Sequence, residues 1–435
     1  MSAQPAGEDT IFGLATGAGQ AALAMMRMSG PASGRMLDSL CRRRPAPRRA
    51  VLRTLRAPSG TALDHALVLW MPGPGSYTGE DTAELFLHGG RAVAEGVADA
   101  LVGLGARPAE AGEFTRRAVR NGRLGLTEAE AVVDLIEAET AAQRDQALRQ
   151  LDGELGRLYT GWAERLRMLL AQAEALIEFS DEDLPPDEEE RADAELRTLR
   201  AEIANHLDDG RRGERLRDGL VFAVTGAPNV GKSSLVNALA GRDVAIVSAR
   251  PGTTRDALET RVVLGGVPVT LVDTAGLRET DDPIEAEGVR RARERTARAD
   301  LVIRVCDGVG DERAGTGDLS GLLVASKADL GRRAHPGAIQ VSVVTGTGLD
   351  TLRARLDEAA QALTASAGPP ALTRARHRAA LEEALYCLAE AEAARLPELR
   401  AEELRLAMRA IGRVTGQVGV EDVLDTIFSR FCIGK

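Results

Sequence analysis

The chain has 435 residues, which is room for about three domains of ordinary size. Its 44% of hydrophobic and 28% of charged residues are typical of a globular protein, while a net charge of −10 and only 3% of aromatic residues argue against a basic nucleic-acid binder or a stacking platform for bases. The four cysteines are too far apart for a zinc motif or a disulfide framework, and neither a presequence nor an apolar run of membrane-spanning length is present, so we predict a cytoplasmic protein with no membrane contact.

The first half of the chain changes texture near residue 119. Residues 1–118 are rich in Gly and Pro and carry short apolar runs, which predicts an N-terminal α+β domain. Within it, the arginine-rich stretch 42–49 is interpreted as a solvated loop. Residues 119–216 show apolar residues at helical spacing, and we expect a capping box at Thr127 to Glu130 to start the first helix of an α-helical domain.

The second half resembles one domain inserted into another. Residues 217–367 alternate apolar runs with helical stretches, which predicts a doubly wound, mostly parallel α/β sheet. Residues 368–435 return to helical spacing and are assigned to the second part of the helical domain. The fold class is therefore multidomain, with expected strands in the insert at Leu220–Thr225, Val267–Val272, Leu301–Cys306, Leu322–Ala325 and Ile339–Val341.

A phosphate-binding loop is the most informative motif. The sequence Gly-Ala-Pro-Asn-Val-Gly-Lys-Ser at residues 226–233 follows a predicted buried strand and opens a predicted helix that continues through Ser234. Glycines allow the backbone N–H groups to curl around phosphate oxygens, and the helix N-terminus adds partial positive charge. Lys232 would reach the β- and γ-phosphates, and Ser233 would offer its hydroxyl to Mg²⁺.

Further motifs in the insert point to guanine nucleotides. Gly252 to Asp256 has the threonines of a switch I segment, and Asp273-Thr274-Ala275-Gly276 ends a predicted strand, where a carboxylate can face the metal through water. The segment Ser326-Lys327-Ala328-Asp329 would place Asp329 on the two ring donors of guanine, which rejects adenine. Ser326 stands where Asn is usual, which we expect to weaken support on the side of the base, and Ser342 fits the last base-contacting turn. The order and spacing of these motifs predict a GTPase.

The handling of the attacking water is left open by the motifs alone. Leu277 occupies the position after the switch II glycine, and its apolar side chain cannot orient a water molecule. Acidic residues just downstream could do so, or could be a solvated loop: Glu279, Asp281, Asp282 and Glu285. Asn229 within the loop is a candidate ligand for a potassium ion that would supply positive charge in the transition state.

Beyond these motifs, the whole chain resembles the MnmE (TrmE) family of tRNA-modification GTPases. The resemblance rests on segments spread from end to end: Asp9-Thr10-Ile11-Phe12, Arg27 to Pro31, Tyr77 to Asp81, His88-Gly89-Gly90, Gly112 to Thr115, Gly252 to Asp256, Asp273 to Arg278, and the C-terminal Phe431-Cys432-Ile433-Gly434-Lys435.

The resemblance implies an activity and its partners. Family members form a homodimer and act on tRNA with an FAD-dependent flavoprotein, MnmG, in a heterotetramer or larger complex. They place a carboxymethylaminomethyl-type group on carbon five of the wobble uridine, with a one-carbon unit from methylene- or formyl-tetrahydrofolate. Their G domains dimerise with potassium, and hydrolysis requires GTP and Mg²⁺. By this resemblance the N-terminal domain binds tetrahydrofolate and mediates dimerisation.

The resemblance also assigns roles to residues of this sequence. The catalytic set is Glu285, which would orient the water, with Lys232 and Asn229. Mg²⁺ would bind Ser233 and Thr254, potassium would bind Asn229, Ser248, Arg250 and Thr253, and folate would be bordered by Arg27, Glu84, Arg123 and Lys435. The nucleotide would contact Asn229, Val230, Gly231, Lys232, Ser233, Ser234, Ser248, Ala249, Arg250, Pro251, Gly252, Thr253, Thr254, Asp273, Thr274, Ala275, Gly276, Ser326, Lys327, Asp329 and Ser342.

Two other functions compete with this one. A ribosome-assembly GTPase would use GTP only to switch its affinity for RNA, and would lack the N-terminal Thr-Gly-Glu-Asp segment and the Cys-Ile-Gly-Lys tail. A metabolic folate-dependent transferase with a regulatory GTPase is the third reading. Wobble-uridine nucleosides in a deletion strain would separate all three.

Overall fold

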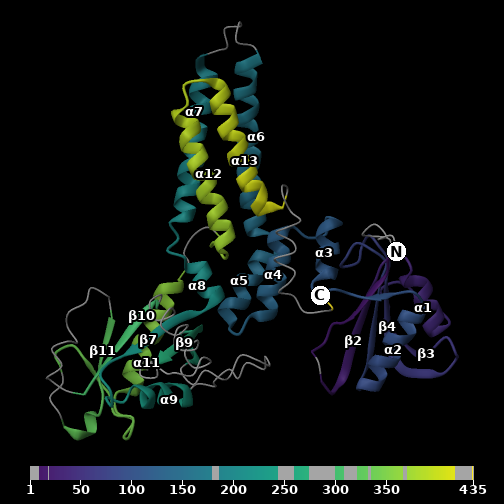
Figure 1. The fold of residues 1–435 in the computed structure, drawn as a ribbon, viewed down its shortest axis with the longest axis horizontal. Helices are drawn as coiled ribbons and strands as arrows, with labels where there is room; N and C mark the ends of the chain where they lie inside the picture. The colour runs from purple at the N-terminus through teal and green to yellow at the C-terminus, as the bar shows by residue number, and fades with distance from the viewer. Residues whose placement is uncertain are drawn as a thin grey trace, which may run out of the picture. The chain divides into compact units, whose positions relative to one another are not determined.

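The computed structural model describes residues 9–17, 19–178, 186–242, 259–273, 299–307, 321–331, 335–365, 370–416 and 434. The chain divides into two compact units: Met1–Val133 with Gln150–Met168 and Met408–Lys435, and Asp134–Arg149 with Leu169–Ala407. Figure 1 follows the chain through both units from purple to yellow. Within the residues that the structure describes, no helix is both long and apolar enough to cross a membrane.

The first unit is built on a mixed sheet of six described strands in the order β3-β4-β5-β2-β1-β6. All neighbouring strands are antiparallel except β1 and β6, which are parallel. The strands are β1 (Ile11–Leu14), β2 (Ala21–Ser29), β3 (Val51–Arg56), β4 (Ala62–Met71), β5 (Thr82–Gly89) and β6 (Arg107–Pro108).

The two faces of this sheet differ, because residues alternate between them along each strand. One face packs its core against α1 (Ser33–Cys41) and α2 (Arg91–Gly103), with fully buried residues such as Val68 and Leu85. The other face carries a row of apolar side chains in register across four strands: Leu52, Leu67, Phe86 and Met25. Leu52 is 66% exposed and Leu67 is 41% exposed. The helix α3 (Glu113–Arg120) follows β6.

The helical part confirms the predicted texture but corrects the start of its first helix. The helix α4 (Leu126–Glu137) begins before Thr127, and a carboxylate oxygen of Glu128 accepts the N–H of Gly125 at 2.6 Å. Thr127 and Glu130, the expected capping pair, are instead buried. Glu128 accepts the N–H of the residue three positions before it, as the glutamate of a capping box does. The residue before the helix is a glycine, however, so no side chain accepts an N–H of the first turn in return.

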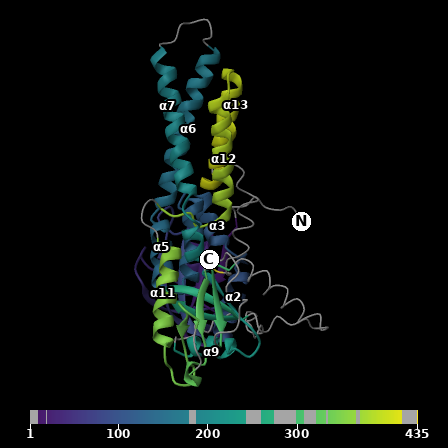
Figure 2. The ribbon, with the colours of Figure 1, turned by 90° about the vertical axis from the view of Figure 1, so that its left-hand side faces the viewer.

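The remaining helices of this part vary in length from seven to 25 residues. In the second unit, α7 and α12 contact each other and run side by side in both views (Figures 1 and 2). Buried residues of these two helices include Leu196, Leu199 and Leu388, all 0% exposed. The helices are α5 (Ala141–Leu151), α6 (Glu154–Glu178), α7 (Pro186–Leu207), α8 (Arg212–Asp218), α12 (Ala375–Ala393) and α13 (Pro397–Thr415).

The α/β insert confirms the predicted parallel sheet. Its described strands have the order β12-β11-β10-β7-β9-β8, and every pair is parallel except β8 with β9. The predicted strands agree with the observed bounds to within a residue: β7 (Leu220–Thr225), β9 (Val267–Asp273), β10 (Leu301–Cys306), β11 (Gly321–Ala325) and β12 (Ile339–Gln340), while β8 (Glu259–Leu264) was not foreseen.

Two helices, α9 (Lys232–Arg242) and α11 (Leu349–Thr364), share one core with this sheet. Alternate strand residues, such as Leu220, Phe222 and Val224 of β7, are buried in that core. Because β7 lies near the middle of the sheet, the turn that follows it emerges at the carboxyl edge, next to the ends of β9 and β10. This edge is where ligands bind in open α/β sheets.

Candidate nucleotide-binding site

The turn after β7 has the backbone of a phosphate cradle. Gly226 has φ 146° and Gly231 has φ 99°, and a Cβ on Gly226 would lie 2.1 Å from the carbonyl oxygen of Val305. Only glycine fits such a position. Asn229 also adopts a left-handed φ of 63°, a conformation that asparagine tolerates better than most residues. The loop therefore curls as the motif predicted.

Lys232 is held across this cradle. Its side chain is 4% exposed, and Nζ donates to the carbonyl oxygens of Gly226 and Ala227, both at 2.9 Å. These bonds satisfy a buried ammonium group on the loop itself and keep the charge at the concave side. A phosphate oxygen entering the loop would meet a cation that is already positioned.

Two oxygen-bearing side chains meet at the carboxyl edge of the sheet. Ser233 Oγ donates to Oδ2 of Asp273 at 2.5 Å, from the first turn of α9 to the last residue of β9. Asp273 is 7% exposed. A hydroxyl and a carboxylate suit Mg²⁺, which prefers hard oxygen ligands, so the residues present fit this metal.

Ser326 connects the predicted base-binding turn at residues 326–329 to the loop at residues 226–233. Its side-chain oxygen lies 2.5 Å from the carbonyl oxygen of Val230 in the loop and 3.1 Å from that of Cys306 at the end of β10. The residue is 9% exposed, so its hydroxyl proton serves one of these carbonyls in a nearly dry setting. Ser326 therefore joins the loop at residues 226–233 to the ends of β10 and β11.

The predicted guanine turn is assembled around Asp329. Ser342 Oγ donates to Oδ1 of Asp329 at 2.6 Å, and the N–H of Ala328 donates to the carbonyl oxygen of Val341 at 3.1 Å. Lys327 has φ 55° and its Nζ donates to the carbonyl oxygen of Asn229 at 2.7 Å. The carboxylate is therefore oriented by one turn while the lysine stem crosses to the phosphate loop.

The structure thus brings together one part of the predicted nucleotide set: Asn229, Val230, Gly231, Lys232, Ser233, Ser234, Asp273, Ser326, Lys327, Asp329 and Ser342. The other predicted positions lie outside the described residues, and their roles stay predictions: Ser248, Ala249, Arg250, Pro251, Gly252, Thr253, Thr254, Thr274, Ala275, Gly276 and Glu285, together with Lys435.

Two of the predicted folate residues are paired in the first unit. Arg27 of β2 faces Glu84 of β5 in register, and its Nε and Nη2 donate to Oε1 of Glu84 at 3.0 and 2.8 Å. The two side chains are only 16% and 13% exposed. The Arg27 guanidinium also lies 5.3 Å from the ring centre of Tyr77 and 5.8 Å from that of Phe114. Two aromatic rings thus flank the ion pair.

The C-terminal end of the chain reaches the same strands. Gly434 has φ 105°, and a Cβ there would lie 2.3 Å from the carbonyl oxygen of Leu14. A Cβ on Gly13 would lie 3.1 Å from Cα of Gly434, and Gly13 pairs with Arg27 across β1 and β2. Arg123, the third described folate candidate, has its Cγ 3.2 Å from a Cβ built on Gly79.

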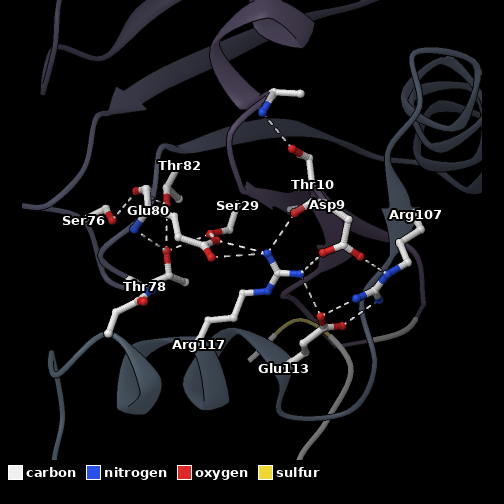
Figure 3. A network of polar contacts seen from close by, with 12 residues as sticks. Asp9, Thr10, Ser29, Ser76, Thr78, Glu80, Thr82, Arg107, Glu113 and Arg117 are labelled. Atoms are coloured by element: carbon white, nitrogen blue, oxygen red, sulfur yellow. Dashed lines mark hydrogen bonds and ion pairs between the residues drawn. The ribbon is translucent and has the colours of Figure 1, made fainter. Parts of the chain in front are cut away.

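Sequence reasoning missed a partly buried ionic network in the same unit (Figure 3). Arg117 reaches from α3 and donates to Asp9 Oδ1 at 2.7 Å, to Glu113 Oε1 at 2.9 Å and to Glu80 Oε2 at 3.1 Å. Arg107 donates to Glu113 at 2.6 and 2.8 Å and to Asp9 at 2.5 Å. The sequence did contain a signal for this network, because Asp9, Glu80 and Glu113 all lie in the segments that carry the family resemblance. Their spacing in the sequence, however, did not indicate that they lie close together.

The network fixes its own charges. Burial raises the pKa of Asp9 and of Glu113, but hydrogen bonds from Arg107 and Arg117 outweigh it, and both pKa values lie below their usual range. Burial lowers the pKa of Arg117, and the surrounding carboxylates raise it further than burial lowers it. Because all three groups stay ionised near neutral pH, the network anchors α3 to β1 and to the β4–β5 connection.

Comparisons with known proteins place both halves of the chain. Residues 10–123 match the family model described as GTP-binding protein TrmE N-terminus, and residues 126–432 match the MnmE helical domain. A protein of Gluconacetobacter diazotrophicus named tRNA modification GTPase MnmE is 62% identical over 438 residues, covering 99% of this chain and 100% of its own. A protein of the same name from Granulibacter bethesdensis is 55% identical and covers 98% of this chain and 100% of its own. Among solved structures, the G domain of the FeoB iron transporter of T. maritima is 28% identical over 33% of this chain and 99% of that chain, with a TM-score of 0.22.

Proposed function

The chain belongs to the MnmE family of tRNA modification GTPases, and we propose that its GTP hydrolysis drives modification of carbon five of the wobble uridine of tRNA. The group formed would be of the carboxymethylaminomethyl type. A flavoprotein of the MnmG type would be the partner, and a tetrahydrofolate derivative would supply the one-carbon unit. The observation that carries this proposal is that one chain combines the Asp329–Ser342 turn after β11 with the Arg27–Glu84 pair near Gly434, the residue before the last.

In this proposal the nucleotide site works through residues that are already placed. Lys232 and the loop N–H groups would neutralise the phosphates, Ser233 would hold Mg²⁺ with Asp273 behind it, and Asp329 would accept the two ring donors of guanine. Mg²⁺ supplies charge stabilisation at the leaving oxygen when bound. Thr254 is proposed as a second Mg²⁺ ligand.

Water activation and the second half of the active site are proposed to lie in the two switch segments. Glu285 would orient the attacking water, in place of the glutamine that Leu277 replaces. Asn229 is exposed on the loop, so its amide is accessible to a potassium ion shared with Ser248, Arg250 and Thr253 and to the G domain of a second subunit. A Glu285→Ala variant should lose turnover with little change in GTP affinity, while lost GTP binding would instead indicate a structural role.

The folate site is proposed around the Arg27–Glu84 pair. A carboxylate can accept two hydrogen bonds from a pterin edge, and Arg27, Arg123 and Lys435 would suit the acidic tail of the ligand. The ring of the half-buried Tyr77, which lies beside Arg27, would pack against a flat ligand here. Glu84→Gln should weaken 5-formyltetrahydrofolate binding by about ten-fold in calorimetry, because a charge-assisted bond is lost. Glu95→Gln, which also breaks an arginine pair but on an exposed helix surface, is the matched control.

The open face of the first sheet supports the proposed homodimer. Leu52 and Leu67 expose apolar surface in one row with Phe86 and Met25, and such a contiguous patch is typical of an interface. The Arg27–Glu84 pair lies in the next row of side chains on the same face of the sheet. A second copy bound to this face would therefore cover the folate site as well. Leu52→Glu with Leu67→Glu should give monomers in sedimentation velocity, whereas Leu396→Glu, at another exposed leucine, should not. A double variant that stays dimeric would remove this face from the proposal.

Nucleoside analysis of tRNA tests the proposal as a whole. Deletion of the gene should remove the modification at carbon five of the wobble uridine, and a plasmid copy should restore it, while a Lys232→Ala copy should not. Unchanged wobble uridines would favour the alternative, a ribosome-assembly GTPase that switches RNA affinity. The match of residues 10–123 to the TrmE N-terminus weighs against that alternative. The cytoplasmic location and the division at residues 118, 216 and 367 are part of the same proposal.

A further inference from the structure

The segment from the end of α1 through β3 is the most basic part of the chain. Between residues 40 and 57 it has seven arginines and no acidic residue, although the whole chain has a net charge of −10. The helix α1 contacts β3, which is the edge strand of the first sheet, so both lie at this edge of the sheet (Figure 1). We call the exposed or half-exposed members of this segment the α1–β3 arginine surface: Arg42, Arg43, Arg48, Arg49, Arg53 and Arg56.

Hydrogen bonds and a ring contact hold parts of this segment against the sheet. Arg53 Nε donates to the carbonyl oxygen of Arg43 at 3.4 Å, which joins β3 to the end of α1. The N–H of Arg48 donates to the carbonyl oxygen of Trp70 at 2.8 Å, and Arg44 lies over the Trp70 ring at 4.8 Å. Arg42 and Arg48 both have a left-handed φ of 59°, so the chain turns sharply at two of the charged positions.

Only one of the seven arginines has an acidic partner in the described structure. Arg44 donates to both carboxylate oxygens of Asp38, at 2.6 and 3.2 Å, and Asp81 adds a weaker attraction to the same guanidinium. The side chains of Arg42, Arg43 and Arg49 are exposed, and none of them forms an ion pair with a described residue. Their mutual repulsion is therefore offset only by solvent and mobile ions.

The chemistry of this surface selects its ligand. Guanidinium groups bind phosphates in a planar, two-pronged geometry, and the release of counterions from a polyanion favours binding of several phosphates at once. The only aromatic ring in this cluster, Trp70, is 4% exposed and covered by Arg44, so no platform is offered to unpaired bases. The surface thus fits the backbone of a folded RNA rather than a single strand.

We propose that the α1–β3 arginine surface binds the phosphate backbone of tRNA, with Arg42, Arg43 and Arg49 as its principal contacts. This inference rests on the proposed function in that it takes tRNA as the ligand. It assigns sequence-independent affinity to the first unit and leaves recognition of the modified base to the catalytic assembly. It adds a ligand to residues 42–49, which form the mostly exposed loop that the sequence predicted.

The test uses the full-length protein and unfractionated bacterial tRNA labelled with fluorescein at its 3′ end. The variant Arg42→Asn, Arg43→Gln, Arg49→Gln removes three charges, and asparagine tolerates the left-handed turn at position 42. Fluorescence anisotropy between about 50 and 200 mM salt should show binding weakened by about ten-fold or more, with the slope of log K against log salt reduced by about 2. Replacement of the same three arginines by lysine should restore most of the affinity.

The control removes three charges elsewhere. Arg91→Gln, Arg167→Gln, Arg355→Gln takes away three exposed arginines that each have an acidic partner, and it should leave tRNA binding unchanged. Equal losses in both triple variants would mean that net charge alone matters, and would overturn the proposal. So would unchanged tRNA binding with lost association of the flavoprotein, which would make this surface a protein contact. Because the readout is binding, an error about the wobble-uridine chemistry would leave the anisotropy result standing.

Discussion

Arg374 donates from Nη2 to Oδ1 of Asp134 at 2.7 Å, although 240 residues separate the two in sequence. The same carboxylate oxygen accepts Nε of Arg217 at 2.9 Å. Arg217 lies in α8, just before the first strand of the α/β insert, and Arg374 lies just before α12, where the chain leaves the insert. One carboxylate therefore holds together the entry and the exit of the nucleotide-binding domain.

We expect Asp134→Ala to destabilise this junction strongly. Asp134 is 9% exposed and the two arginines are 19% and 11% exposed, so the substitution would leave two nearly buried cations without their shared partner. Breaking such a pair destabilises by about 3 kcal/mol, which should lower the thermal midpoint of the full-length protein by several degrees. Asp218→Asn is the control, because Asp218 also pairs with Arg217 but is 63% exposed. Equal thermal midpoints for the Asp134 variant and the wild type would contradict the role of Asp134 in holding this junction together.

Ser326→Ala should weaken guanine nucleotide binding. The change removes the donor that joins the phosphate loop to the end of β10 and leaves the carbonyl oxygen of Val230 without that bond, while the carbonyl oxygen of Cys306 keeps the N–H of residue 326. An unsatisfied buried acceptor costs about 1 kcal/mol or more, so the Kd for a fluorescent GDP analogue should rise about five- to ten-fold. Ser326→Asn keeps a donor and should bind nearly as the wild type does. If the alanine variant binds the nucleotide as tightly as the wild type, the hydrogen bond from Ser326 does not contribute to nucleotide affinity.

Potassium should accelerate GTP hydrolysis and sodium should not, because sodium is too small for a site built around Asn229. The left-handed loop residue presents its side chain at the surface of the cradle, and a cation there would act on the charge that develops in the transition state. Asn229→Ala should remove most of the potassium stimulation, by about ten-fold or more in turnover, while Asn237→Ala on the exposed side of α9 should retain it. Equal rates in both salts would reject the proposed dimerisation of G domains.

The sequence predicted local features well because their causes are local. The loop at residues 226–233 follows from two glycines and a lysine at fixed spacing, and Leu220–Thr225 is a strand in both the prediction and the structure. The predicted start of α4 was wrong, because Gly125 rather than Thr127 precedes the helix. The carboxylate of Glu128 accepts the N–H of Gly125. The observed arrangement satisfies the N–H of Gly125 but provides no side-chain acceptor from the cap residue, and nothing in the sequence alone chooses it over the predicted one.

Relationships between distant segments could not be predicted from composition or spacing. Arg117 meets Asp9 across 108 residues and Asp134 meets Arg374 across 240, and such pairs depend on the order of strands and on where helices dock. Ser326 shows the same limit at one residue. The sequence predicted weaker support for the base because asparagine is absent, whereas the fold brings the shorter serine close enough to bond the loop.

His206 of α7 gives the second unit a dependence on pH. The residue is 4% exposed, and burial lowers its pKa to about 4, with Arg378 and His377 adding to the shift and Asp209 opposing it. In the unfolded chain its pKa would be about 6.5. Between these two values the unfolded state binds a proton that the native state refuses, so stability must rise with pH across that window.

We therefore expect the second unit to be most stable above about pH 6.5 and to lose up to about 3 kcal/mol from this residue as the pH falls towards 4. His206→Gln, which cannot titrate, should flatten the difference in unfolding midpoint between about pH 5 and pH 7. The exposed His65 is the matched control, because His65→Gln should leave that difference as in the wild type. A His206 variant that keeps the full difference would contradict the assignment of this pH dependence to His206.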